Sequence, residues 1–234
     1  MTVTPELSVV IPVHDEARSI AASIRSWHAT LADHAIRAAI IVIDDGSTDG
    51  TGAIVEGLAL DNVAVVRQAN AGHGAAVLAG YRLTSAPFVL QVDGDDEIGA
   101  SQFQALWAAR SETVLVLGCR EPATRPLVRR AITTLAGLWL RMLAGRAVRD
   151  PNVPYRLVPR ALLQSVLEAM PPQTFAPNLA MTLHALRHGW QVASVPVVEQ
   201  PRPHRRALGG LRLWQGVARA VRDTATSARR HRRL

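Results

Sequence analysis

The sequence is short of several residue types, and each shortage excludes a class of protein. A single cysteine, Cys119, excludes an intrachain disulfide framework and a cysteine-rich zinc site. Lysine is absent, so all 26 basic residues are arginine. Aromatic residues make up 4%, which argues against a stacking platform for single-stranded nucleic acid. No run of about 18 uncharged apolar residues occurs, so no membrane-spanning helix is predicted.

The net charge of +7 is unevenly distributed along the 234 residues. The segment 201–234 holds ten arginines against one acid, Asp223, whereas residues 1–200 hold 16 arginines against 18 acids. The basic character therefore belongs to the last segment. Such a segment can meet phospholipid headgroups, nucleic acid or only water.

Apolar runs and helical patterns alternate along the first half of the chain. Buried strands are predicted over 7–13, 38–43, 63–66 and 88–92, with helices over 19–32, 51–60 and 74–83 between them. This order predicts an α/β fold with an open, mostly parallel sheet and helices on both faces. Further elements are predicted as helices over 101–109, 122–148, 161–169 and 178–188, and strands over 114–117 and 191–198. Pro151, Pro154 and Pro159 are expected to break the chain.

Acidic residues follow three of the predicted strands. Asp15 and Glu16 follow the first strand, Asp44 and Asp45 the second, and four acids between 93 and 97 the fourth. The carboxyl ends of strands in an open α/β sheet form the ligand crevice. A divalent cation that bridges a diphosphate would balance such a cluster, and hard oxygen ligands suit Mg²⁺ or Mn²⁺. For each pair alone, turn chemistry is the alternative, because Asp-Gly and Asp-Asp sequences commonly form turns.

Four sequence blocks resemble the family 2 glycosyltransferases, which have the Rossmann-like GT-A fold. They are VIPVHDE at 10–16, IDDGSTDGT at 43–51, NAGHGAA at 70–76 and VDGD at 92–95. Later segments are similar to the polyprenyl-phosphate branch, which includes dolichyl-phosphate mannosyltransferases. These are GCR at 118–120, RDPNVPYRL at 149–157, VPV at 195–197, and the spacing of Arg206, Gly209 and Arg212.

The resemblance implies a role for each matching residue. Asp93 and Asp95 would hold the metal and act in catalysis, and Asp96 or Asp150 would be the general base if the acceptor is an alcohol. Arginines would clamp phosphate oxygens. The nucleotide-sugar site would comprise Pro12, His14, Glu16, Ile43, Asp45, Asp93, Gly94, Arg120, Arg206 and Arg212. His14 stands where the family usually has Tyr, and His73 where it often has Lys.

The resemblance further implies a metal-dependent transfer of a sugar from a nucleoside-diphosphate sugar to an acceptor, with inversion at the anomeric carbon. The expected acceptor is a polyprenyl phosphate. Two alternatives are a transferase acting on a saccharide hydroxyl and an inactive nucleotide- or RNA-binding protein. A pyrophosphorylase-like nucleotidyltransferase is disfavoured, because no Gly-rich basic loop follows the first strand.

The expected organisation is one GT-A domain followed by a basic amphipathic segment. The domain covers 1–210, with a nucleotide-sugar half over 1–120 and an acceptor half over 121–210, and the segment covers 211–234. The expected location is cytoplasmic, peripheral on the inner face of an anionic membrane. The stripe of Leu135, Leu138, Trp139, Met142 and Leu143 is either core or a second membrane-facing surface.

Overall fold

The computed structural model describes residues 4–121, 127–200 and 219, and its elements alternate as predicted over the first half of the chain. The strands are β1 (Leu7–Val13), β2 (Ala38–Asp45), β3 (Val63–Gln68), β4 (Phe88–Val92), β5 (Val114–Arg120), β6 (Tyr155–Pro159) and β7 (Gln191–Val197). The helices are α1 (Ile20–Asp33), α2 (Thr51–Glu56), α3 (His73–Arg82), η1 (Ala100–Gln102), α4 (Phe103–Ala108), α5 (Leu127–Ala144), α6 (Arg160–Ala169) and α7 (Pro177–Arg187).

The described strands form one seven-stranded sheet in the order β3-β2-β1-β4-β6-β5-β7. Pairing is parallel between β1 and β2, β2 and β3, β1 and β4, and β5 and β7. The mostly parallel sheet predicted from the sequence is therefore confirmed. Parallel strands end at one edge, which places the loops after β1, β2 and β4 side by side.

Strand β6 corrects the prediction, because its segment was expected to be a break. It runs antiparallel to both β4 and β5 and lies between them, with all five residues buried. Pro159 is its last residue, where a missing N–H interrupts little of the ladder. A buried five-residue strand shows no alternation, so its sequence pattern alone does not reveal it.

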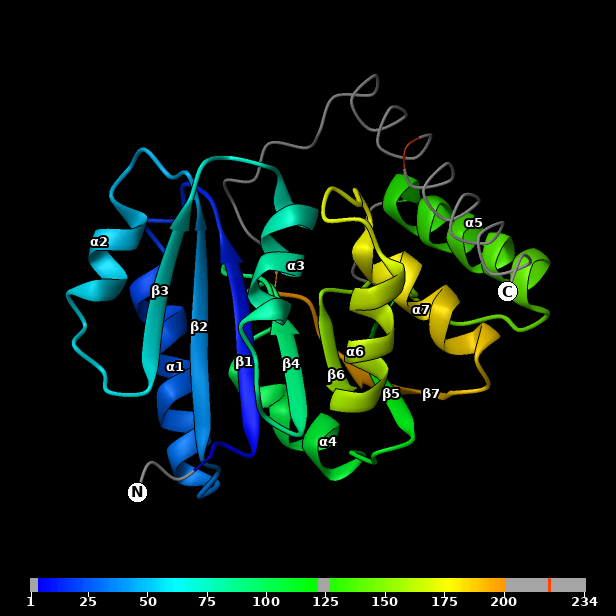
Figure 1. Ribbon diagram of the computed structural model, residues 1–234, viewed down its shortest axis with the longest axis horizontal. Helices are drawn as coiled ribbons and strands as arrows, with labels where there is room; N and C mark the ends of the chain where they lie inside the picture. Colours follow the sequence, from blue (N-terminus) through cyan, green and yellow to red (C-terminus); the bar gives the residue numbers. More distant parts are fainter. Residues whose placement is uncertain (1–3, 122–126, 201–218, 220–234) are drawn as a thin grey trace.

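Helices cover both faces of the sheet, as predicted (Figure 1). Contacts join α3, α6 and α7 into one group and α1, α2, η1 and α4 into another. Beneath the second group, Trp27 is fully buried, with its ring 5.9 Å from that of Phe103 and 6.1 Å from that of Tyr155. This core fixes the strands and therefore the loops at their carboxyl ends.

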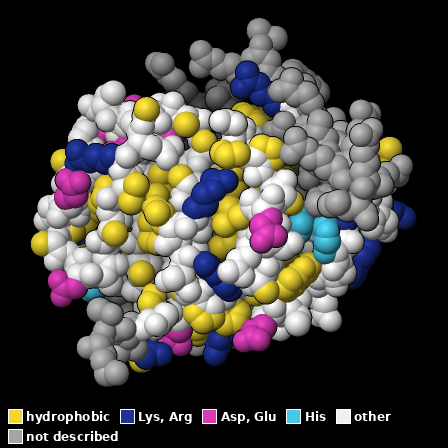
Figure 2. Space-filling model, viewed as in Figure 1, with side chains coloured by type: hydrophobic (Ala, Val, Ile, Leu, Met, Phe, Trp, Pro, Cys, Tyr) yellow, Lys and Arg dark blue, Asp and Glu magenta, His cyan; other side chains and the backbone are white. Residues whose placement is uncertain are grey.

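Helix α5 packs on α7 and divides the predicted apolar stripe between core and surface. Within the stripe, Leu143 is half-buried against the apolar cluster of α5 and α7, whereas Leu135, Leu138 and Met142 are 55%, 51% and 78% exposed. Leu140, which the stripe does not include, is fully buried in that cluster. No helix among the described residues is long and apolar enough to cross a bilayer. On the face shown in Figure 2, described charges of both signs lie scattered among apolar side chains.

Candidate active site

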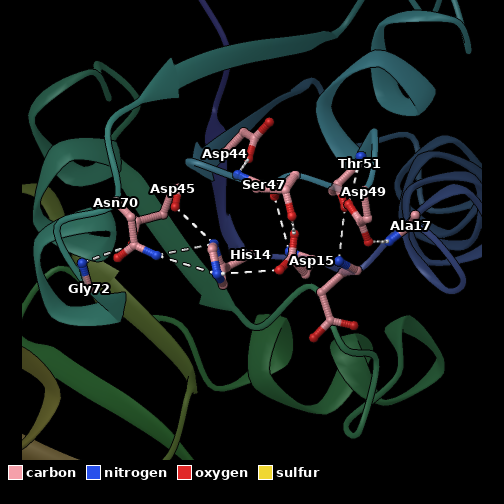
Figure 3. A network of polar contacts seen from close by, with 12 residues as sticks. His14, Asp15, Ala17, Asp44, Asp45, Ser47, Asp49, Thr51, Asn70 and Gly72 are labelled. Carbon is pink, nitrogen blue, oxygen red and sulfur yellow. Dashed lines mark hydrogen bonds and ion pairs between the residues drawn. The ribbon is translucent and has the colours of Figure 1, made fainter.

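The loops after β1 and β2 are joined by hydrogen bonds that use the acidic motif residues (Figure 3). The Asp15 carboxylate accepts the Thr48 N–H at 2.8 Å, and the Ser47 hydroxyl accepts the Asp15 N–H at 3.1 Å. Asp49 accepts the N–H groups of Ala17 at 2.9 Å and Thr51 at 3.0 Å. These carboxylates hold two loops together by satisfying backbone donors.

Asp45 links the same edge to the loop between β3 and α3. Its buried carboxylate accepts hydrogen bonds from Gln68 Nε2 at 2.7 Å and from the Ala71 and Gly72 N–H groups at 2.9 Å each. Asp44 accepts the N–H of Ser47, three residues further along, at 2.9 Å, which closes the turn after β2. The turn chemistry left open by the sequence accounts for these contacts. Contact between Asp45 and a nucleotide stays a prediction.

His14 is held between two of these loops, as Figure 3 shows. Its Nδ1 lies 2.9 Å from the Asp45 carbonyl oxygen, and its Nε2 lies 3.3 Å from Nδ2 of Asn70. The same Nε2 lies 3.5 Å from Oδ2 of Asp15, so both ring nitrogens have polar neighbours. The imidazole is thereby fixed at the carboxyl edge of the sheet.

Three other residues of the predicted nucleotide site contribute structure at this edge. Pro12 and Ile43 are buried neighbours in the β1–β2 register, and Ile43 packs beneath α3. Glu16 accepts the Ser19 hydroxyl at 3.1 Å, at the start of α1. The structure therefore places Pro12 and Ile43 inside the sheet and Glu16 on its rim.

A pocket opens beside the end of β4, and its wall contains the two predicted metal ligands. It is lined by Asp93, Asp95, Glu97, Ile98, Arg120 and Pro154. Asp95 accepts the Glu97 N–H at 3.2 Å, and Asp93 lies 3.6 Å from Nε2 of His73. A side chain at Gly94 would place its Cβ only 2.4 Å from Val13, so the acidic turn packs directly on β1.

Arg120 forms the basic part of the pocket wall and is held from behind by Asp150. Its Nε donates to Asp150 Oδ2 at 2.6 Å and its Nη2 to Oδ1 at 2.9 Å, while Nη1 lies 3.5 Å from Glu199. Burial alone would lower the pKa of Arg120, but its hydrogen bonds to Asp150 and the charges of the nearby carboxylates raise it. The guanidinium is therefore permanently charged and oriented.

Asp150 has an unusual backbone, with φ of 45° in the left-handed region. Its side chain is 4% exposed. The sequence suggested Asp150 as a general base and Arg120 as a phosphate clamp, and the structure brings these two residues together. Arg206 and Arg212 lie outside the described residues.

Sequence reasoning missed Arg156, a fully buried arginine on β6. It pairs in register with Gln91 on β4 and with Leu117 on β5, so it lies between the strands that carry Asp93 and Arg120. Burial lowers the pKa of Arg156 to about 10, which leaves it charged at neutral pH. An arginine inside the apolar run at 153–158 was the signal in the sequence.

Residues after β7 run along the acidic turn. Gln102 Nε2 donates to the Val198 carbonyl at 2.8 Å, and the Gln200 N–H donates to the Glu97 carbonyl at 2.7 Å. These contacts hold residues 198–200 beside Glu97, at the rim of the pocket. They also place Glu199 beside Arg120.

Curated relatives of this chain include enzymes named for polyprenyl phosphates. It is 29% identical over 209 residues to the polyprenol monophosphomannose synthase of Mycolicibacterium smegmatis, covering 83% of this chain and 77% of that protein. It is 26% identical over 180 residues to the undecaprenyl-phosphate 4-deoxy-4-formamido-L-arabinose transferase of Salmonella paratyphi A, covering 75% of this chain. The chain spans about half, 55%, of the length of that second relative.

Solved structures similar to this one confirm the predicted GT-A fold. Glucosyl-3-phosphoglycerate synthase from Mycobacterium tuberculosis, solved with Mn²⁺, UDP-glucose and phosphoglyceric acid, gives a TM-score of 0.72 at 20% identity, covering 96% of this chain and 80% of that one. Mannosyl-3-phosphoglycerate synthase from Rubrobacter xylanophilus gives 0.70 at 18% identity, covering 98% and 76%.

Residues 8–166 match the profile of the family described as Glycosyl transferase family 2. This match covers more than half of the chain and includes the four motif blocks, both predicted metal ligands, Arg120 and Asp150. The chain belongs to glycosyl transferase family 2.

Proposed function

We propose that this protein transfers a sugar from a nucleoside-diphosphate sugar to a polyprenyl phosphate. The observation that carries the proposal is the pocket where Asp93, Asp95 and Glu97 face Arg120 at the carboxyl end of the sheet. A carboxylate wall suits a cation-bridged diphosphate, and an oriented guanidinium suits a phosphate. The relatives named for polyprenyl and undecaprenyl phosphates support the choice of acceptor.

Asp93 and Asp95 are the residues that would hold Mg²⁺ or Mn²⁺. Both line the pocket, and their carboxylate oxygens are the donors these hard cations prefer. Among the described residues no group of three or more His, Cys, Asp or Glu side chains is arranged around a metal position. The donor chemistry fits an ion that also takes oxygens from a diphosphate. When bound, the metal would supply Lewis-acid stabilisation of the charge on the departing diphosphate.

Arg120 would orient the phosphate that attacks. Its Nε and Nη2 donate to Asp150, and its Nη1 lies 3.5 Å from Glu199, so a phosphate would have to share Nη1 with that carboxylate. A phosphate acceptor is already anionic, so it needs positioning rather than a general base. This favours a phosphate over an alcohol, because both oxygens of Asp150, the candidate base for an alcohol, already accept hydrogen bonds from Arg120 at 2.6 and 2.9 Å.

Nucleotide binding is assigned to the edge formed by the loops after β1, β2 and β3. The fixed ring of His14 would stack on the base, while Pro12, Ile43 and Asp45 would shape the site from within. Glu16 lies on the rim, and Gly94 lets the acidic turn approach β1. Arg206 and Arg212 stay predicted phosphate ligands outside the described residues.

Helix α5 offers a surface that suits an anionic membrane. Leu135, Leu138 and Met142 project outward, with exposed Arg130 and Arg141 on the same helix. The segment 122–149 contains six arginines and no acid. An exposed apolar stripe bordered by arginine is typical of a helix lying in a lipid interface. We therefore propose a peripheral location, with the basic segment 211–234 as a second contact.

Transfer assays with a matched set of acceptors test the function. Purified protein with Mn²⁺ is incubated with GDP-mannose, UDP-glucose and other nucleotide sugars and with a short-chain polyprenyl phosphate. The same polyprenol without phosphate and a free saccharide are the controls. Sugar recovered only on the phosphorylated lipid supports the proposal. Transfer to the saccharide, or donor hydrolysis alone, would overturn the proposed acceptor.

A further inference from the structure

Arg156 is a charge buried inside the domain, which is costly unless all of its donors are satisfied. Its Nε and Nη2 donate to the Val153 carbonyl at 3.0 and 2.6 Å, and Nη2 also donates to the Pro151 carbonyl at 3.2 Å. Nη1 donates to the Asn178 carbonyl at 2.8 Å and contacts the Thr182 hydroxyl at 3.5 Å. Three carbonyls and a hydroxyl therefore accept its hydrogen bonds within the described part of the chain.

These contacts converge on the segment that follows Asp150. Arg156 binds the carbonyls one and three residues after Asp150. The Thr182 hydroxyl on α7 donates to the same Pro151 carbonyl at 2.8 Å. The loop is therefore fixed from β6 and from α7 at once.

Fixing the loop is needed because Asp150 does not adopt its conformation readily. A non-glycine residue in the left-handed region is strained, and the conformation persists only where its surroundings hold it. Asp150 must keep this backbone for both of its oxygens to reach Arg120, at 2.6 and 2.9 Å. A released loop would let the bidentate geometry relax.

We propose that Arg156 is a positioning residue that, by holding the Pro151 and Val153 carbonyls, keeps Asp150 in its left-handed conformation and so orients Arg120 toward the pocket. The chain of contacts runs from Arg156 through the loop to Asp150, and from Asp150 to the pocket wall. The catalytic consequence rests on the proposed function, because it requires Arg120 to bind a substrate phosphate.

The structural part of the proposal can be tested without substrate. Hydrogen exchange of the Arg120 Nε–H is followed by NMR of ¹⁵N-labelled protein, with the signal assigned by its loss in Arg120→Lys. Thr182→Val removes one bond to Pro151 with little change of shape, and Arg156→Lys retains the charge but not the fork. Both variants should speed the exchange about tenfold or more.

Arg160→Lys is the matched control. Arg160 lies four residues further along and also binds a carbonyl, that of Thr84, but at the opposite end of β6. Arg160→Lys should therefore leave the exchange rate of the Arg120 Nε–H unchanged. Unchanged exchange in both Thr182→Val and Arg156→Lys, or equal acceleration in Arg160→Lys, would overturn the positioning role.

A double-mutant cycle tests the catalytic part with the short-chain polyprenyl phosphate as probe. Asp150→Asn and Arg156→Lys should each lower kcat/KM by about tenfold to a hundredfold. The double variant should lose no more kcat/KM than the more damaging of the two single substitutions, because both act through one contact. Additive losses would overturn the proposal. If wild-type protein transfers no sugar to the lipid, the proposed function fails while the exchange experiment still decides the role of Arg156.

Discussion

The acids after β1 and β2 and the acids after β4 lie at the same edge of one sheet, yet they meet different neighbours. Asp45 accepts three hydrogen bonds from residues of the next loop, and Asp49 accepts backbone donors from both sides. Asp93 and Asp95 instead line a pocket together with Arg120. The first group joins loops, and the second is the group that we propose binds a ligand.

The contacts of the first group follow from the loops that meet around it. The loops after β1, β2 and β3 lie within hydrogen-bond distance of one another, so N–H groups of one loop reach the carboxylates of another. The loop after β4 lies next to β6, an antiparallel strand whose following residues run away from this edge. Acidic residues at strand ends therefore share a position but not a role, and substitutions should separate the two groups.

The largest expected effect is that of Asp95→Ala on turnover. Removing a pocket carboxylate should lower metal-dependent transfer by about a thousandfold, since a bound metal supplies several kcal/mol of charge stabilisation. The melting temperature should change much less than turnover, because Asp95 lies in a loop at the edge of the sheet and not among the apolar side chains of the core. Turnover, Mn²⁺ affinity and melting are measured on one preparation, with exposed Asp61→Ala as control. Full activity in EDTA would contradict the metal assignment.

The next effect is the stability lost in Arg120→Met. This variant leaves Asp150 buried without its guanidinium, and breaking one side of such a pair typically costs about 3–5 kcal/mol. Adding Asp150→Asn in the same chain should restore part of the loss. Urea unfolding measures both variants.

The control for Arg120 is Arg67→Met, which breaks a pair between Arg67 and Glu56 whose side chains are about half exposed. Its cost should be about 0–1 kcal/mol. Equal losses for the buried and the exposed pair would show that burial at Asp150 is not the deciding factor.

A third variant, Asp45→Ala, tests whether an acid that joins loops differs from the acids that we propose bind a ligand. It leaves the N–H donors of Gln68, Ala71 and Gly72 without their acceptor, which should cost about 1–3 kcal/mol of stability. Saturated with donor sugar, the variant should retain much more activity than Asp95→Ala. Wild-type melting together with complete loss of transfer would instead place Asp45 among the ligand-binding acids.

The sequence was sufficient for the strands that are buried on both faces, because β1, β2 and β4 are continuous apolar runs. It was insufficient for β6, whose place between β4 and β5 depends on pairing with distant strands. The pocket acids Asp93 and Asp95 and their neighbour Arg120 were predicted together. The hydrogen bonds that Asp45 accepts were not predicted, because their donors lie 23 to 27 residues further along the chain.

The smallest expected effect concerns Asp49, which joins the loops after β1 and β2 from an exposed position. Burial alone would raise its pKa, but hydrogen bonds from Thr51 and Ala17 outweigh this and hold the pKa below its usual 3.8. A carboxylate with a lowered pKa stabilises the fold above the unfolded-state pKa and loses that contribution as pH falls through the folded-state value. Asp49→Asn should therefore lower the urea midpoint slightly at pH 6, and the gap to wild type should close below about pH 4. A gap that stays constant down to pH 3 would mean that Asp49 joins the loops through its shape and not through its charge.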